Sequence, residues 1–157
     1  MERRLLLAAL AAAPLMPATV RAHHGWSGFD QDRPLYLEGR AAKVTWRNPH
    51  AELDLDVPER LVLPADLKQR ALPKQTTAVD GEALLAKTQV PTRRDRRWEV
   101  ELAPLTRLED WKVEEIRPGT EVSVIGFAAP GEQGAAVLRA EYLFVGGKVY
   151  GLRSSPA

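Results

Sequence analysis

The sequence predicts an all-β fold, a small OB-like barrel of five to six strands with one short helix. Three observations carry this prediction. Short stretches of alternating apolar and polar residues are typical of half-buried strands. Pro-Gly and Gly-Gly pairs separate several of these stretches, and a helical pattern stands between the third and the fourth of them. A β-sandwich remains the alternative, because its strands would show the same alternation.

Six stretches alternate in this way. They are residues 35–46, 50–57, 97–102, 121–127, 136–145 and 148–152. In the first stretch, Leu35 and Leu37 lie on one phase, whereas Ala42 and Val44 lie on the other. A bulge at Gly39 would account for this change of phase.

The second stretch alternates most regularly. Its inward positions are expected to be Ala51, Leu53, Leu55 and Val57. His50 and Glu52 then lie on the outward, solvent-side face, because successive side chains of a strand point to opposite faces. The turn before this strand is formed by Asn48-Pro49.

The helical pattern covers residues 105–116 and ends before Pro118. Thr106 is expected to be its N-cap, with Glu109 three residues later completing a capping box. At the other end of the domain, Gly146-Gly147 predicts a hairpin turn between the last two strands.

Residues 59–96 differ from the rest of the chain, because they are rich in proline and alternate little. We interpret them as an irregular insertion between the second and third strands, with a helical turn at residues 81–87. Insertions of this length are either functional or loosely ordered. A cluster of arginines follows at Arg93, Arg94, Arg96 and Arg97. It is interpreted as a solvated patch, with the docking of an anionic partner as the alternative.

The first 22 residues have the order of a secretory signal peptide. Arg3 and Arg4 give a basic start, residues 5–16 are apolar, and Val20 and Ala22 precede a cut before His23. The apolar run of about a dozen residues is shorter than the ~20 residues of a membrane-spanning helix. We therefore expect a periplasmic or secreted single-domain chain over residues 23–157, with no stable membrane insertion after cleavage. A retained anchor is the alternative, and both the Sec and the twin-arginine export routes stay open.

Removal of this segment changes the charge balance of the chain. It carries three of the 22 basic residues and one of the 21 acidic residues, which leaves 19 basic and 20 acidic ones. A net charge near −1 argues against a nucleic-acid binder, which would need a basic face. Both methionines also lie in this segment and the chain has no cysteine, so residues 23–157 offer no sulfur ligand and no disulfide.

The three histidines of the chain are the strongest candidates for a metal site: His23, His24 and His50. After cleavage, the amine and imidazole of His23 could chelate a metal together, and a second imidazole would complete a nitrogen-rich site of the kind that Cu(II) prefers. Zinc is the alternative, with Glu52 or Asp54 on the same face as a carboxylate ligand. A frayed terminus at His23 and His24, and a structural role for His50, are the competing interpretations.

The aromatic residues support a second kind of site. Trp26 and Phe29 follow the histidines closely and are expected to pin the N-terminal segment on the barrel. Trp26, Trp46 and Asn48 form a candidate ligand face, because exposed tryptophan rings can stack on a ligand. The competing interpretations are the anchoring role for Trp26 and a place in the core for Trp46.

Several short motifs resemble a family of small exported bacterial proteins of unknown function. The motifs are Ala22-His23-His24, Phe29-Asp30, Leu37-Glu38-Gly39 and Asn48-Pro49-His50. The resemblance implies an OB-like periplasmic fold and no established activity, and it selects the same three histidines. The insertion at residues 59–96 is longer than the family pattern leads one to expect.

The residues lead to three functional hypotheses. The first is a non-enzymatic periplasmic protein that binds a divalent metal, copper favoured, as a carrier or sensor accessory. The second is an interaction or ligand-binding module without a metal. The third is a copper oxidase or oxygenase with an N-terminal histidine brace. No serine, cysteine or acidic pair stands in a catalytic spacing, so no catalytic residue is assigned.

Overall fold

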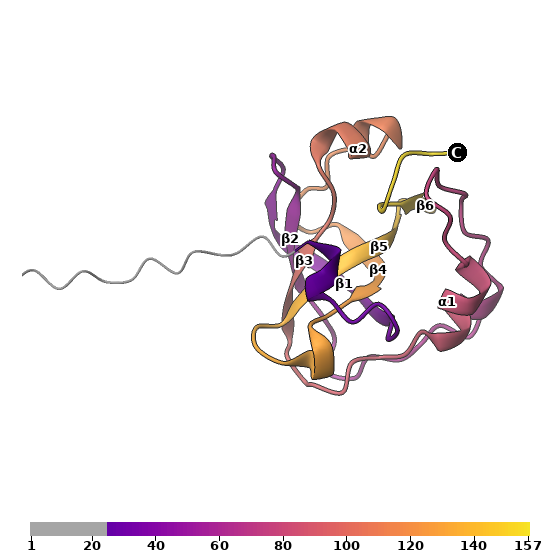
Figure 1. The fold of residues 1–157 in the computed structure, drawn as a ribbon. Coiled ribbons are helices and arrows are strands. Elements are labelled where there is room, and N and C mark those ends of the chain that lie inside the picture. The colour runs from indigo at the N-terminus through magenta and orange to yellow at the C-terminus, as the bar shows by residue number, and fades with distance from the viewer. Residues whose placement is uncertain (1–24) are drawn as a thin grey trace, which may run out of the picture.

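The structure, a computed structural model, describes residues 25–157. Six strands form its sheet: β1 (Leu35–Thr45), β2 (Glu52–Asp56), β3 (Arg97–Glu101), β4 (Glu121–Phe127), β5 (Val137–Val145) and β6 (Lys148–Gly151). The strands are hydrogen-bonded in the order β3-β2-β1-β4-β5-β6, and a parallel pairing of β3 with β5 closes the first five into a barrel (Figure 1). The predicted OB-like barrel is therefore confirmed, and the closure excludes the sandwich.

The change of phase in β1 occurs after Ala41. The pairing of β1 with β2 shifts between Ala41 and Lys43, and Ala42 is exposed. The prediction of a bulge at Gly39 was wrong, because Gly39 stays in register with β4. Gly39 serves a different purpose, since a Cβ at this position would collide with the backbone carbonyl oxygen of Asp56. Only glycine allows β1 and β2 to approach so closely here.

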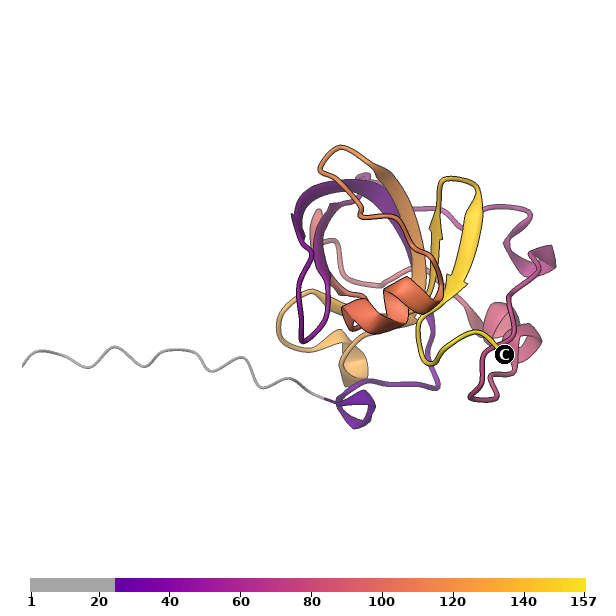
Figure 2. The same ribbon diagram turned by 90° about the horizontal axis from the view of Figure 1, so that it is seen from above.

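Helix α2 (Leu105–Asp110) covers one end of the barrel (Figure 2). Leu108 is buried in the barrel core, and Trp111 packs against the same cluster. The predicted cap at Thr106 was wrong. Pro104 is the N-cap, no side chain of the helix caps it, and the amide oxygen of Asn48 accepts a hydrogen bond from the Leu105 N–H at 3.1 Å.

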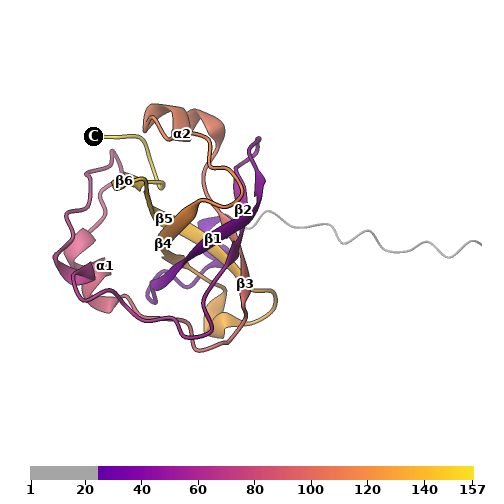
Figure 3. The same cartoon turned by 180° about the vertical axis from the view of Figure 1, so that it is seen from behind.

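The insertion between β2 and β3 is an ordered cover rather than a loose loop. It contains α1 (Gly81–Lys87), whose first turn is capped by the Asp80 carboxylate through the Ala83 N–H at 3.0 Å. Figure 3 shows it passing around the side of the barrel formed by β4, β5 and β6. Its buried leucines meet the apolar residues on the outer face of the sheet, and together they form a second cluster: Leu67, Leu84, Leu85, Tyr36, Ile125, Phe127, Tyr142 and Phe144. The sheet is thus apolar on both faces where the insertion covers it.

The remaining strand predictions are confirmed to within two residues at each end, as expected for boundaries drawn from a sequence pattern. Gly146 and Gly147 have φ angles of 59° and 73°, so the predicted two-residue hairpin turn joins β5 to β6. Within residues 25–157 no helix is both long and apolar enough to cross a membrane.

Candidate functional site

His50 lies in the turn between β1 and β2, directly after the cis Asn48–Pro49 peptide. It shares the outward face with Glu52, and its Nδ1 is 3.5 Å from a carboxylate oxygen of Glu52. The prediction that His50 faces solvent was wrong in one respect, because the side chain is only 7% exposed. Its neighbour Ala51 exchanges backbone hydrogen bonds with Leu102 and Ala103, at 2.8 and 2.9 Å. These bonds draw the turn against the segment that follows β3.

A row of charged side chains continues from this histidine across the barrel. Glu52 stands directly opposite Glu101 on β3, and Glu101 stands opposite Arg139 on β5. The Glu101 carboxylate accepts a hydrogen bond from Arg139 at 3.0 Å, and the two side chains are 12% and 15% exposed. The row therefore leads from His50 over β2 and β3 to a half-buried ion pair.

Trp26 anchors the N-terminal segment at the far end of this row. Its indole lies under two guanidinium groups, at 5.1 Å from the Cζ of Arg139 and 4.2 Å from that of Arg153. It also meets Phe127 edge to face, with ring centroids 6.3 Å apart. Phe29 is buried in the outer cluster close by. The prediction that Trp26 and Phe29 pin this segment on the barrel is confirmed.

A buried carboxylate holds Arg153 in place over the indole. Glu141 is fully buried and accepts a hydrogen bond from Arg153 at 2.7 Å. Gln75, from the insertion, donates a second hydrogen bond to Glu141 at 3.1 Å. Burial raises the pKa of Glu141, and the positive charge of Arg153 opposes that shift. Trp26, the insertion and the carboxyl-terminal segment are thereby joined around one charge.

The candidate ligand face is divided between different parts of the core. Trp26 packs against the outer cluster, whereas Trp46 packs against the barrel interior. The side chain of Asn48 is used in the hydrogen bond to the start of α2 described above. Both tryptophans are partly buried, in agreement with the anchoring role expected for Trp26 and the core place expected for Trp46.

His23 and His24 lie outside the described residues, as does the predicted signal peptide. Within residues 25–157, no group of three or more metal-ligating side chains is arranged to hold an ion. Within these residues, His50 and Glu52 are therefore at most part of a metal site.

The sequence reasoning missed Arg139, Arg153 and Glu101, which surround or support the Trp26 anchor. In the sequence they are ordinary charged residues on or near strands. The contact of Arg139 with Glu101 follows from the pairing of β3 with β5, which joins residues that are 38 positions apart, whereas Arg153 is held by Glu141.

The comparisons with known proteins point to one family. Residues 11–62 match the model of a family of unknown function (DUF6152). This confirms the predicted resemblance to a family without an assigned activity, and the matched segment includes all three histidines. No curated protein and no solved structure matches the chain significantly.

Proposed function

We propose that this protein is exported, is cleaved before His23, and binds a divalent metal ion, with Cu(II) preferred. His23 would supply its amine and imidazole, and His50 a second imidazole. His24 and Glu52 stand close enough in sequence to these residues to complete or orient the site. The role is that of a carrier or sensor accessory rather than an enzyme, because the sequence has no catalytic constellation.

The observation that carries the proposal is the anchor of Trp26 beside Arg139. Arg139 is on β5, next to β3, and β3 is next to β2, which begins two residues after His50. Neighbouring strands are about 4.8 Å apart, so roughly 10 Å separate the row of Arg139 from the row of Glu52. Three residues of extended chain span up to about 10 Å. Since His23 precedes Trp26 by three residues, the tether matches the distance to the row of Glu52, and the side chains of His23 and His50 would span the remaining two residues.

The environment of His50 also suits a ligand. The side chain is nearly buried, so binding a metal would cost little additional rotamer entropy. Its contact with Glu52 resembles the carboxylate–imidazole pairs that orient histidine ligands in metal sites. The imidazole nitrogens of His23, His24 and His50, together with the terminal amine, provide the nitrogen-rich ligand set that Cu(II) favours.

The test is a Cu(II) titration of protein that begins at His23, followed by electron paramagnetic resonance for nitrogen coupling. His50→Ala should weaken binding at least tenfold, and so should one extra residue placed before His23, which removes the α-amine of His23. Glu121→Gln is the matched control for a Glu52→Gln variant, because Glu121 is an exposed carboxylate on β4, outside the proposed site. The control should bind copper as the wild type does.

Two results would overturn the proposal. If His50→Ala binds Cu(II) as tightly as the wild type, the N-terminal histidines chelate alone and the converging site does not exist. If the intact mass of protein exported by its host shows a start other than His23, the amine ligand is lost. In either case the module without a metal becomes the better hypothesis.

Binding should also depend on pH in a defined direction. A protonated imidazole cannot ligate a metal, and a free histidine titrates near ~6.5. Copper affinity should therefore fall as the pH drops from 8 to 5. An affinity that stays constant over this range would exclude imidazole ligands.

A further inference from the structure

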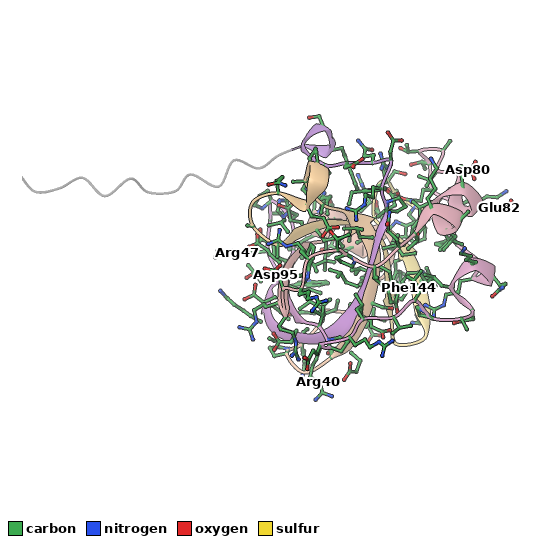
Figure 4. All side chains as sticks on the ribbon, turned by 90° about the horizontal axis from the view of Figure 1, so that it is seen from below. Arg40, Arg47, Asp80, Glu82, Asp95 and Phe144 are labelled. Atoms are coloured by element: carbon green, nitrogen blue, oxygen red, sulfur yellow. The ribbon has the colours of Figure 1, made fainter. Side chains whose placement is uncertain are left out.

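A second candidate site lies at the other end of the barrel from α2. Here β2 ends at Asp56 and β3 begins at Arg97, and the two arms of the insertion leave and re-enter the sheet. Between these arms the structure has a cavity of about 920 Å³, which is within the ~300–1,000 Å³ typical of small-molecule sites. Figure 4 shows the barrel end-on from this side, with Asp95 at its edge and Arg40 pointing away from it.

The wall of the cavity changes in character from bottom to rim. The bottom is apolar: Leu61, Val90 and Pro91 are partly exposed there, above buried core residues such as Leu37 and Trp98. The rim carries four arginines and two acids: Arg60, Arg93, Arg94, Arg96, Glu59 and Asp95. The lining therefore has an excess of two positive charges above an apolar floor.

Two of the rim arginines are already engaged within the protein. Arg93 pairs with Asp95 at 2.6 Å and stacks on the Trp98 ring, with its Cζ 5.5 Å from the centroid. Arg96 donates to the backbone carbonyl of Val57 at 3.2 Å and lies 4.0 Å from Glu59. Arg93 and Arg96 are therefore part of the cavity wall and are not available to bind an anion.

Arg60 and Arg94 differ from the other two. Both are exposed and line the cavity, and within residues 25–157 neither side chain forms a hydrogen bond or an ion pair. A guanidinium group at the mouth of an apolar cavity recognises a carboxylate through paired N–H donors. These two residues are therefore the ones that can receive an anionic group.

The segment that bears Arg94 is held in place by a buried carboxylate. Glu132 is 7% exposed and accepts hydrogen bonds from the Thr92 N–H and hydroxyl, both at 3.0 Å, and from the Arg93 N–H at 3.1 Å. Arg33 lies 2.6 Å from the same carboxylate. A wall fixed by several charge-assisted hydrogen bonds is pre-organised, so ligand binding would lose little conformational entropy in ordering it.

From this geometry we infer that the cavity binds a small amphipathic carboxylate, such as a medium-chain fatty acid. Its apolar tail lies along the partly exposed side chains of Leu61, Val90 and Pro91, and its carboxylate meets Arg60 and Arg94. Charge complementarity selects an anion, and the apolar floor selects one with a hydrocarbon tail. This site is separate from the proposed metal site, because it uses no histidine and lies at the β2–β3 end opposite His50.

The experiment measures the binding of decanoate by calorimetry and tryptophan fluorescence, in the presence of a metal chelator so that copper cannot contribute. Decanol, which has no charge, and acetate, which has no tail, are measured beside it. The variant is Arg60→Gln with Arg94→Gln. The matched control is Arg47→Gln with Arg117→Gln, which removes the same charge from two exposed arginines outside the cavity.

We expect the cavity variant to bind decanoate at least tenfold more weakly than the wild type, and the control to stay within twofold. Decanol should bind at least tenfold more weakly than decanoate, and acetate should not compete. Equal loss in the variant and the control would mean that only net charge matters and would overturn the inference. The same holds if acetate competes with decanoate, or if the wild type binds no decanoate.

Discussion

Replacing Arg153 with glutamine should destabilise the protein strongly at neutral pH and much less at acidic pH. Arg153 lies 2.7 Å from Glu141, whose side chain is fully buried, and it also covers the indole of Trp26. The substitution leaves the Glu141 carboxyl in the interior without its cation. Gln75 remains as a hydrogen-bond donor at 3.1 Å but carries no charge.

The loss of unfolding free energy is limited by protonation of the Glu141 carboxyl. Breaking a buried ion pair by removing one partner costs ~3–5 kcal/mol. A carboxyl can limit that cost by taking a proton, at ~1.4 kcal/mol for each unit between the pH and its ordinary pKa of 4.5. Protonation therefore limits the loss of unfolding free energy to about 3.4 kcal/mol at pH 7 and to about 0.7 kcal/mol at pH 5. The lost contact with Trp26 adds ~0.5–1 kcal/mol at either pH.

The direction in which the stability loss changes with pH follows from the pKa of Glu141. Burial raises the pKa of Glu141 in the folded protein, and loss of Arg153 raises it further. A raised folded-state pKa gives stability that is present below the unfolded value and is lost as the pH rises through the folded value. The difference in unfolding free energy between wild type and variant should therefore be about 3–4 kcal/mol at pH 7 and about 1–2 kcal/mol at pH 5.

Chemical denaturation with urea at the two pH values measures this difference. Arg40→Gln is the matched control, because its ion pair with Glu121 is exposed on both sides, at 65% and 68%. An exposed pair contributes only ~0–1 kcal/mol. If Arg153→Gln costs no more than Arg40→Gln, or if its cost is the same at pH 5 and pH 7, the assignment of a buried charge to Glu141 is wrong.

Two further predictions concern single positions. Gly39→Ala should destabilise the barrel by about 3 kcal/mol or more, because the new methyl group would meet the Asp56 carbonyl oxygen. A urea titration measures this loss. Gly25→Ala is the control and should be nearly neutral, because a methyl group there meets nothing within 4 Å. Burial and the hydrogen bond to Glu38 raise the pKa of Tyr36 to about 12. In a spectrophotometric titration Tyr36 should therefore ionise near pH 12, and Tyr36→Phe should remove one tyrosine from the absorbance change above pH 10, where burial also raises the pKa of Tyr142. The stability contributed by the raised pKa of Tyr36 is lost between pH 10 and 12.

The sequence by itself determined the strands and their inward faces. Leu53, Leu55 and Val100 are buried because alternation along a strand is a local property that burial of one face imposes. The hairpin at Gly146-Gly147 was equally local, since two consecutive positive φ angles favour glycine. The OB-like barrel was predicted from the number of strands and from the position of the helix between the third and the fourth strand.

The candidate site could be predicted only in part. His50 and Glu52 were placed on one face by alternation, and the structure brings them within 3.5 Å. The burial of His50 was not predicted, because it depends on the segment after β3 that pairs with the turn. Trp26 was expected to anchor the N-terminal segment, but its arginine partners were not.

Only the tertiary structure decided which residues surround these local elements. The parallel pairing of β3 with β5 brings Arg139 to Glu101, and the insertion turns Tyr36 and Phe144 from surface positions into a second core. The cavity between Arg60 and Arg94 likewise exists because the two arms of the insertion meet at one end of the barrel. A sequence pattern reports the periodicity of one segment, whereas these contacts depend on chain closure between segments that are far apart in the sequence.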